Sequence, residues 1–207
     1  MNGERDAAPR PGPAGMAMGT APGADELAGA RVALRARQGS GARYDASAAP
    51  ARELYWARLG TAYFARQLNE LSDAALWAAS SRSGWTRRRV IAAVGLEGRA
   101  IAQAIALATS GPSEEFADVG AGALDLAETL PATALRHLVT HAAIHLDVTW
   151  RDLTDEQWDL PIEGVSCTIA RESVFARARS LWASALDLRA SGRLADAPPD
   201  FVAALEV

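Results

Sequence analysis

Hydrophobic side chains recur at helical spacing along most of the chain from residue 51 onward. The pattern predicts four long amphipathic helices, over residues 51–71, 86–110, 131–151 and 172–190. Thr86 is a favourable N-cap for the second helix, and Gly111 followed by Pro112 ends it. Pro131 suits the first turn of the third helix. Four helices of this kind favour an all-α four-helix bundle.

The connections between these helices are expected to be mostly irregular. We expect a polar link with a short helical turn over residues 72–86, a loop or a broken helix over 112–128, and a short β-like segment over 162–171. Thr154 and Gln157 have capping-box spacing. The similar segments LSDAAL (71–76) and LTDEQW (153–158) follow the first and third helices, which indicates two related helix pairs. A last helical piece is expected after a Gly/Pro-rich exit at 191–201.

The first part of the chain has a different composition. Residues 1–48 are rich in Ala, Gly and Pro, with almost no large aliphatic side chain before Leu27. Such a segment cannot bury enough apolar surface to offset its chain entropy. We therefore expect a disordered tail over 1–48, with a short helix near 25–37, and a helical domain over 49–207.

Charge and cysteine content exclude several classes of protein. The formal net charge of −4 gives no excess of positive charge for a nucleic-acid or membrane surface. The single cysteine, Cys167, cannot form a disulfide within the chain, and no histidine near it in sequence marks it as a nucleophile. No continuous run of about 18 apolar residues predicts a membrane span, and residues 1–30 lack the apolar core of a signal peptide. A cytoplasmic monomer or homodimer is expected.

The candidate chemistry is concentrated in the third helix, in the segment RHLVTHAAIHLDVTW (136–150). It holds all three histidines, His137, His141 and His145, each four residues from the next. The apolar arc of this helix is centred on Leu135, Val139, Ala142 and Leu146. A narrow polar side is marked by Arg136, Thr140, Asp147 and Arg151. The histidines fall on a third sector, which can line the bundle interior or its mouth.

Three interpretations of this histidine stripe stay open. The first is that the histidines are hydrogen-bonded or boundary residues without a chemical role. The second is acid–base or substrate-polarising work by His141 or His145. The third is a new metal site, but the stripe spans about 12 Å, so only two neighbours can share one ion. A further ligand would then come from Asp147, Glu97 or Asp187.

Three segments carry a resemblance to a known family. LSDAALWAASSRSGWTRRRVIAAVG, LTDEQWD and RSLWASALDLRASGRLADAPPDF resemble the mycothiol-dependent maleylpyruvate isomerase family, in the DinB-like four-helix-bundle superfamily. The resemblance covers roughly residues 51–205 and is sharpest at SGWTR (83–87), LDL (186–188) and APPDF (197–201). It implies a DinB-like bundle that holds a metal ion, usually zinc. It also implies that the metal activates a thiol such as mycothiol for addition to an unsaturated acid.

The metal ligands that the resemblance implies are missing from this chain. The family uses a histidine eight residues after the Trp of SGWTR, and a Glu and a His four residues apart before the Asp-Leu of LDL. These positions hold Ala93, Ser180 and Ser184. Alanine cannot coordinate, and a neutral serine hydroxyl is a poor zinc ligand. We therefore expect neither the family's zinc nor a mycothiol-dependent site at these positions.

The emptied cavity would then be lined by other side chains. Ala93, Ser180 and Ser184 mark it, Trp182 lies between the two serines in sequence, and Glu97 lies one turn beyond Ala93. A surface arginine is the favoured partner of Glu97. Most tryptophans are expected in the core or at helix ends. The arginines of TRRR (86–89) are expected on a solvated face, although a helix N-terminus can also hold a carboxylate.

Three functions are compatible with these observations. In the first, a metal-free divergent family member acts on a small organic molecule in specialised metabolism, as an isomerase, cyclase or lyase. Its acid–base groups would be His141 and His145, with His137 beside them, and Ser180 and Ser184 would line the cavity. The second function is non-catalytic binding of a small molecule. The third is a thiol-dependent metalloenzyme whose metal has moved to the histidine stripe.

Overall fold

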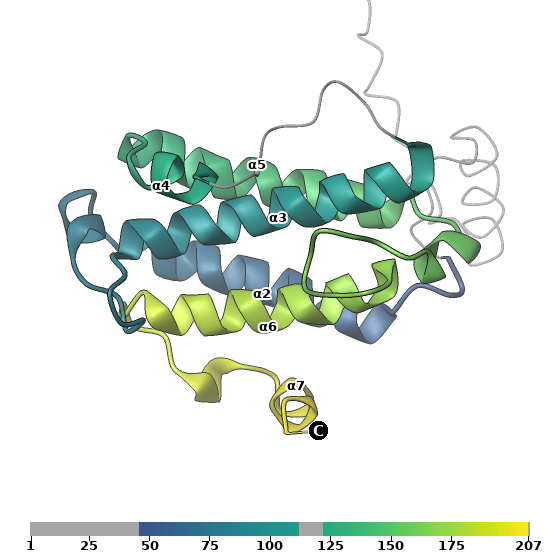
Figure 1. Cartoon of the computed structure of the whole chain (residues 1–207). Coiled ribbons are helices and arrows are strands. Elements are labelled where there is room, and N and C mark those ends of the chain that lie inside the picture. Colours follow the sequence, from purple (N-terminus) through teal and green to yellow (C-terminus); the bar gives the residue numbers. More distant parts are fainter. Residues whose placement is uncertain (1–45, 112–121, 207) are drawn as a thin grey trace, which may run out of the picture. The chain divides into compact units, whose positions relative to one another are not determined.

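A bundle of four long helices makes up most of the computed structural model, which describes residues 46–111 and 122–206. The helices are α2 (Ala51–Asn69), α3 (Arg87–Ser110), α5 (Ala132–Arg151) and α6 (Ala170–Asp187). In Figure 1, α3 and α5 run in one direction, and α2 and α6 run in the other. The predicted all-α four-helix bundle is confirmed.

The predicted helix boundaries hold to within a few residues. Thr86 is the N-cap of α3, and its hydroxyl accepts a hydrogen bond from the Arg89 amide at 3.1 Å. Pro131 is the N-cap of α5 and not part of its first turn. Helix α6 ends at Asp187, earlier than predicted, because the chain turns at Arg189, whose φ of 49° lies in the left-handed region.

The core lies between two helix pairs. Helix α2 packs mainly against α6, and α3 packs mainly against α5; α3 also contacts α6 and the short helix α4 (Ala123–Glu128). The predicted apolar arc of α5 is buried, at Leu135, Val139, Ala142 and Leu146. The largest fully buried aromatic side chains are Trp56, Phe64, Trp158 and Phe201.

Helix α3 is the most central element of the bundle. By length and hydropathy alone it could cross a membrane, and among the described residues no other helix meets that test. More than half of its apolar stretch (56%) is buried against the other helices. A buried core helix of a bundle meets the same test, so α3 adds no evidence for a membrane span.

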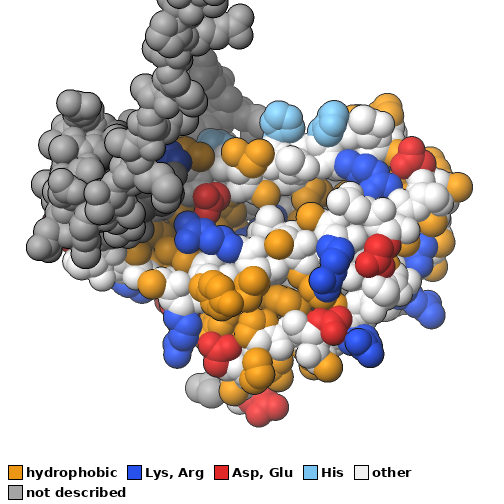
Figure 2. All heavy atoms as spheres, turned by 180° about the vertical axis from the view of Figure 1, so that it is seen from behind, with side chains coloured by type: hydrophobic (Ala, Val, Ile, Leu, Met, Phe, Trp, Pro, Cys, Tyr) orange, Lys and Arg blue, Asp and Glu red, His pale blue; other side chains and the backbone are white. Residues whose placement is uncertain are grey.

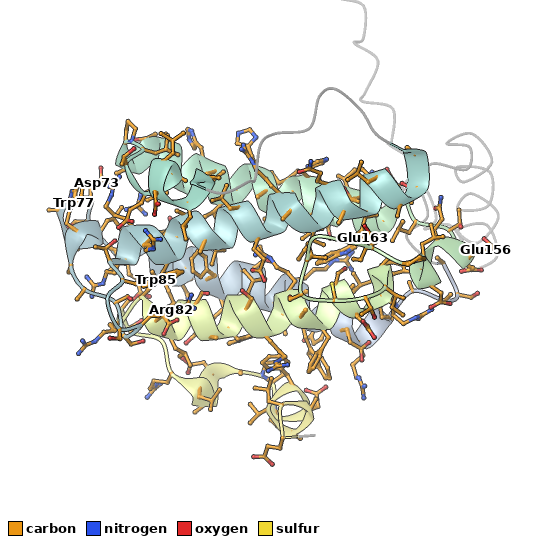
Figure 3. All side chains as sticks on the ribbon, in the orientation of Figure 1. Asp73, Trp77, Arg82, Trp85, Glu156 and Glu163 are labelled. Carbon is orange, nitrogen blue, oxygen red and sulfur yellow. The ribbon has the colours of Figure 1, made fainter. Side chains whose placement is uncertain are left out.

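The connection between α2 and α3 resembles the connection between α5 and α6, and the two lie at opposite ends of the bundle. After α2 comes the 3₁₀ helix η2 (Ala74–Trp77), and then an antiparallel bridge between Ala79 and Thr86. After α5 comes η3 (Glu156–Asp159), and then a bridge between Pro161 and Ile169. The labelled Trp77 and Trp85 mark the first connection in Figure 3, and Glu156 and Glu163 mark the second. The similar hexapeptides thus lead into similar structures.

The capping box predicted in the second connection is present. The Thr154 amide donates to the Gln157 side chain at 2.8 Å, and the Gln157 amide donates to the Thr154 hydroxyl at 3.2 Å. The β-like segment is reduced to the single bridge at Ile169, and the described residues form no strand.

The end of the chain folds back onto the α2–α6 pair. It forms η4 (Leu194–Asp196) and α7 (Pro199–Ala204), the helical piece that was predicted. The ring of Phe201 lies 5.6 Å from that of Trp56 and 5.9 Å from that of Trp182, measured between centroids. The Trp56 indole also donates to Asp200 at 3.1 Å. These contacts fix α7 beside α6.

Most of the predicted tail, residues 1–45, lies outside the described residues, as does the expected helix near 25–37. The end of that segment belongs with the bundle. The Ser47 hydroxyl and the Ala48 amide both donate to the Asp155 carboxylate at 2.9 Å. Ser47 and Ala48 are thus held against the connection after α5.

The three arginines that open α3 are not on a solvated face. Arg87 donates to the carbonyls of Ala75, Leu188 and Arg189. Arg88 is buried and donates to the carbonyls of Glu128 and Leu130. Arg89 forms ion pairs with Asp125 and Glu128 at 2.7 and 2.9 Å. The run Arg87–Arg89 ties the start of α3 to η2, to α4 and to the end of α6.

Candidate functional site

The histidine stripe faces solvent. His137, His141 and His145 are all exposed, as is Ile144 on the same side of α5. Figure 2 shows the histidine side chains along one edge of the surface. The rings of His137 and His141 lie edge to face, 6.3 Å apart. The possibility that the stripe lines the bundle interior is therefore wrong.

The polar side of α5 explains this placement. Arg136 donates to the carbonyls of Leu68 and Leu71 at 2.7 Å each, at the end of α2. Asp147 pairs with Arg58 of α2 at 3.0 Å. Since the apolar arc packs mainly on α3 and the polar side faces α2, the sector with the histidines is left to solvent.

The acidic residues considered as additional metal ligands are engaged elsewhere. Asp147 pairs with Arg58 of α2, and Asp187, at the end of α6, pairs with Arg82 at 2.9 Å. Glu97 pairs with Arg177. Within the described ranges, no three His, Cys, Asp or Glu side chains lie close enough together to hold a metal ion.

A cluster of polar side chains links α3 and α6 inside the bundle. The Arg177 guanidinium donates through Nη1 to Oε2 of Glu97 at 2.6 Å, and the Ser180 hydroxyl donates to the same oxygen at 2.6 Å. Arg177 also donates to the Val94 carbonyl at 2.8 Å. We call Glu97, Arg177 and Ser180 the ion-pair cluster. It has the short, charge-assisted bonds of a fixed network.

The guanidinium of this cluster is fully inside the protein. The Arg177 side chain is 2% exposed, whereas that of Glu97 is 30% exposed. Burial lowers the pKa of Arg177, and the Glu97 carboxylate opposes that shift. An arginine stays charged even so. Glu97 therefore neutralises a buried positive charge. The prediction that its partner is a surface arginine is wrong.

One nitrogen of Arg177 has no acceptor. Nη2 is buried and makes no hydrogen bond among the described residues. A β-carbon at Gly98 would lie 3.2 Å from Nη2, so glycine leaves room for the guanidinium against α3. The Gly98 position thus helps to seat Arg177.

Glu97 and Ser180 reach the surface in a groove beside α7. This α6–α7 groove has a volume of about 600 Å³ and is lined by Glu97, Ser180, Trp182 and the exposed Arg179, together with apolar residues of α6, η4 and the chain end. Three of the five predicted cavity residues are therefore brought together. Ala93 is half-buried and Ser184 is buried, and neither of them lines this groove.

The residues at the family's ligand positions do not fit a zinc ion. Ala93 offers no donor atom, and the Ser180 hydroxyl gives its proton to Glu97. The nearby carboxylate of Glu97 is already paired with Arg177. A divalent ion would need at least three good ligands here.

Cys167 lies in the connection before α6. Burial, reinforced by Glu172 and Glu97, raises the pKa of its half-buried thiol. The thiol form therefore prevails at neutral pH. A raised pKa disfavours the thiolate that a nucleophile needs.

Sequence reasoning missed Arg177, although a signal was present. Arg177 lies three residues after Val174 and four before Leu181, both fully buried in α6. A charged residue in the middle of an apolar arc predicts a buried partner on a facing helix. The sequence pattern indicated Glu97 as a cavity residue, but its partner Arg177 was not predicted.

The comparisons with known proteins agree with this fold. The sequence model described as "Mycothiol maleylpyruvate isomerase N-terminal domain" matches residues 57–189. Two solved structures, of the mycothiol-dependent maleylpyruvate isomerase and of a histidine-to-alanine mutant of it, are 30% identical to the chain with a TM-score of 0.66. Each match covers 74% of this chain and 66% of the solved chain. No curated protein is similar enough to match.

The order of the helices, the family match and the solved structures lead to one conclusion. Each supports the DinB-like bundle, and the match spans more than half of the chain. The chain belongs to the mycothiol maleylpyruvate isomerase N-terminal domain family.

Proposed function

We propose that this protein is a metal-free member of its family that binds a small organic molecule in the α6–α7 groove. One observation carries the proposal. The ion-pair cluster joins α3 and α6, the two helices that carry the family's ligand positions, and it presents the Glu97 carboxylate to the groove. The chemistry implied by the family, with zinc and mycothiol, forms no part of this proposal because the donor set does not fit.

The groove favours a ligand with an apolar body and a hydrogen-bond-donating group. Trp182, Phe201 and Leu194 supply apolar surface, and Glu97 supplies a carboxylate. Both hydrogen bonds to Glu97 end on Oε2, and Oε1 makes none with the described residues. Oε1 is therefore the atom that a ligand ammonium or hydroxyl would meet.

Proton transfer is the second candidate function. An isomerase- or lyase-type reaction in specialised metabolism would then use Glu97 as the base, because its carboxylate lines the groove. The exposed positions of His141 and His145 remove the geometric support for the histidines in that role. Binding is favoured over reaction because Arg177 and Ser180 already occupy Oε2 of the carboxylate.

The metal-free state is tested by zinc content and zinc titration. We expect the purified protein to contain well under one zinc per chain, and to show no saturable zinc binding by calorimetry. The matched control is the triple variant Ala93→His, Ser180→Glu, Ser184→His, which restores the family's ligands and should bind about one zinc. One zinc per chain in the unmodified protein contradicts the proposal.

The binding site is tested with benzylamine as a probe. We expect saturable binding that shifts the Trp182 indole signal in ¹⁵N–¹H spectra, because Trp182 lines the groove. Glu97→Gln should weaken benzylamine at least tenfold relative to benzyl alcohol. Ala183→Trp, which fills the groove without touching the ion pair, should abolish binding. Benzylamine binding that survives both variants excludes this site.

A further inference from the structure

We infer that the opposite side of the bundle holds a binding site for a small monocarboxylate, whose carboxylate meets Arg177. The site is the groove between α2 and α5, called here the α2–α5 groove. It is a separate opening from the α6–α7 groove, although Arg177 is ion-paired with Glu97 of that groove. Its existence is inferred from an open groove and an unpartnered buried donor.

The groove exists because small side chains face each other across it. Its volume is about 530 Å³, and its walls include Ala57, Ala62 and Ala65 of α2 and Ala143 of α5. Each of the two helices packs mainly against a different partner, α6 or α3, so neither closes over the other. Both helices lie behind α3 and α6 in Figure 1 and therefore on the face seen in Figure 2.

Arg177 reaches this groove from α6. It lines the groove, it is 2% exposed, and its Nη2 has no hydrogen-bond partner among the described residues. Its Nη1 is held on Glu97 and on the Val94 carbonyl, so the guanidinium cannot turn to find another acceptor. Buried donors of native proteins almost always have an acceptor, and a ligand oxygen that enters from the groove would supply one.

The charged groups around the groove are balanced. Arg58, Arg151 and Arg177 line it together with Asp147, and Arg151 pairs with Asp152 at 3.0 Å. The Asp147–Arg58 pair is solvent-exposed at the rim, with side chains 44% and 52% exposed. Glu97 offsets the charge of Arg177 from the other side, so the preference for an anionic group rests on the unpartnered Nη2 donor and not on net charge. A carboxylate is the group that a fixed guanidinium recognises best.

The rest of the lining defines the body of the ligand. Ile144, Leu146, Val148 and Trp150 give the groove an apolar surface along α5. An aliphatic or aromatic acid fits both features, with its apolar part along α5 and its carboxylate at the floor. A polyanion such as a nucleotide would leave further charges against that apolar wall.

The test compares benzoate with benzamide, which has the same shape without the charge. We expect saturable benzoate binding that shifts the Trp150 indole signal and leaves the Trp182 signal in place, with the two signals assigned from Trp150→Phe and Trp182→Phe spectra. Benzamide should bind at least tenfold more weakly. Equal binding of the two probes, or a benzoate shift at Trp182 alone, overturns the inference.

Groove-filling variants keep the test independent of the ion pair. Ala143→Phe should weaken benzoate more than tenfold, whereas Ala183→Phe, in the α6–α7 groove, should leave it unchanged. The absence of saturable benzoate binding in the unmodified protein means that Nη2 is satisfied by a buried water only, which also overturns the inference. Benzylamine binding at Trp182 is measured separately, so either site can fail alone.

Discussion

Two groups of polar side chains invite comparison, the histidine stripe of α5 and the ion-pair cluster of α3 and α6. The stripe is conspicuous in the sequence, with three histidines at regular spacing, yet all three side chains are exposed. The cluster is inconspicuous, a Glu and an Arg eighty residues apart, yet its guanidinium is buried and its bonds are 2.6 Å long.

The difference shows what spacing alone leaves open. Spacing of four places side chains on one helix face, but the neighbouring helices decide which face is buried. Helix α5 uses its polar side to hold α2, through Arg136 and the Asp147–Arg58 pair. A charge that enters the core needs a partner there, so the cluster carries the larger energetic consequence.

The largest effect is expected from Glu97→Gln. The variant leaves the Arg177 guanidinium buried without its countercharge, which should lower the free energy of unfolding by about 3 kcal/mol. Urea denaturation measures the loss. The double variant Glu97→Gln, Arg177→Met removes the stranded charge and should recover more than half of it. If Glu97→Gln lowers the free energy of unfolding no more than a surface substitution does, the ion-pair cluster contributes no more to stability than the histidine stripe.

A smaller loss is expected from Ser180→Ala. It removes one hydrogen bond to a charged group and keeps the ion pair, so stability should fall by about 1 to 2 kcal/mol. Ser180→Thr retains the hydroxyl and serves as the control in the same urea experiment. If the two variants were equally destabilised, the bond from Ser180 to Glu97 would contribute nothing.

Part of the acid response should come from a third place, outside both regions. The hydrogen bond from Tyr63, together with the Arg193 amide, lowers the pKa of Asp196. This stabilisation is complete above the unfolded value of about 4 and is lost as the pH falls through the lowered pKa. Tyr63→Phe removes the largest cause, so the fall in the urea midpoint between pH 6 and pH 3 should be shallower. The exposed Tyr55, changed to Phe, is the matched control.

The smallest effect is expected from the stripe itself. Replacing His137, His141 and His145 together by alanine should change stability by about 0.5 kcal/mol or less, because exposed side chains away from special contacts contribute little. Benzylamine and benzoate affinities should stay within twofold of the unmodified protein. A loss of either affinity would mean that the stripe reaches a binding site after all.

The fold was far more predictable from sequence than the site. Periodicity is a local property, so the helices and the N-cap at Thr86 follow from neighbouring residues. The partner of Glu97 is eighty residues away in the chain, and its burial depends on how α3 meets α6. The arginines at 87–89 show the same limit, because their acceptors are carbonyls on α4, η2 and the end of α6.

Two of these arginines, Arg87 and Arg88, also affect how the molecule unfolds locally. Arg87 and Arg88 reach five backbone carbonyls between them, on segments that are far apart in the chain. An opening that frees one of these segments must release contacts that also hold the others. In hydrogen exchange, the amides of η2, of α4 and of the last turn of α6 should therefore exchange as one cooperative unit.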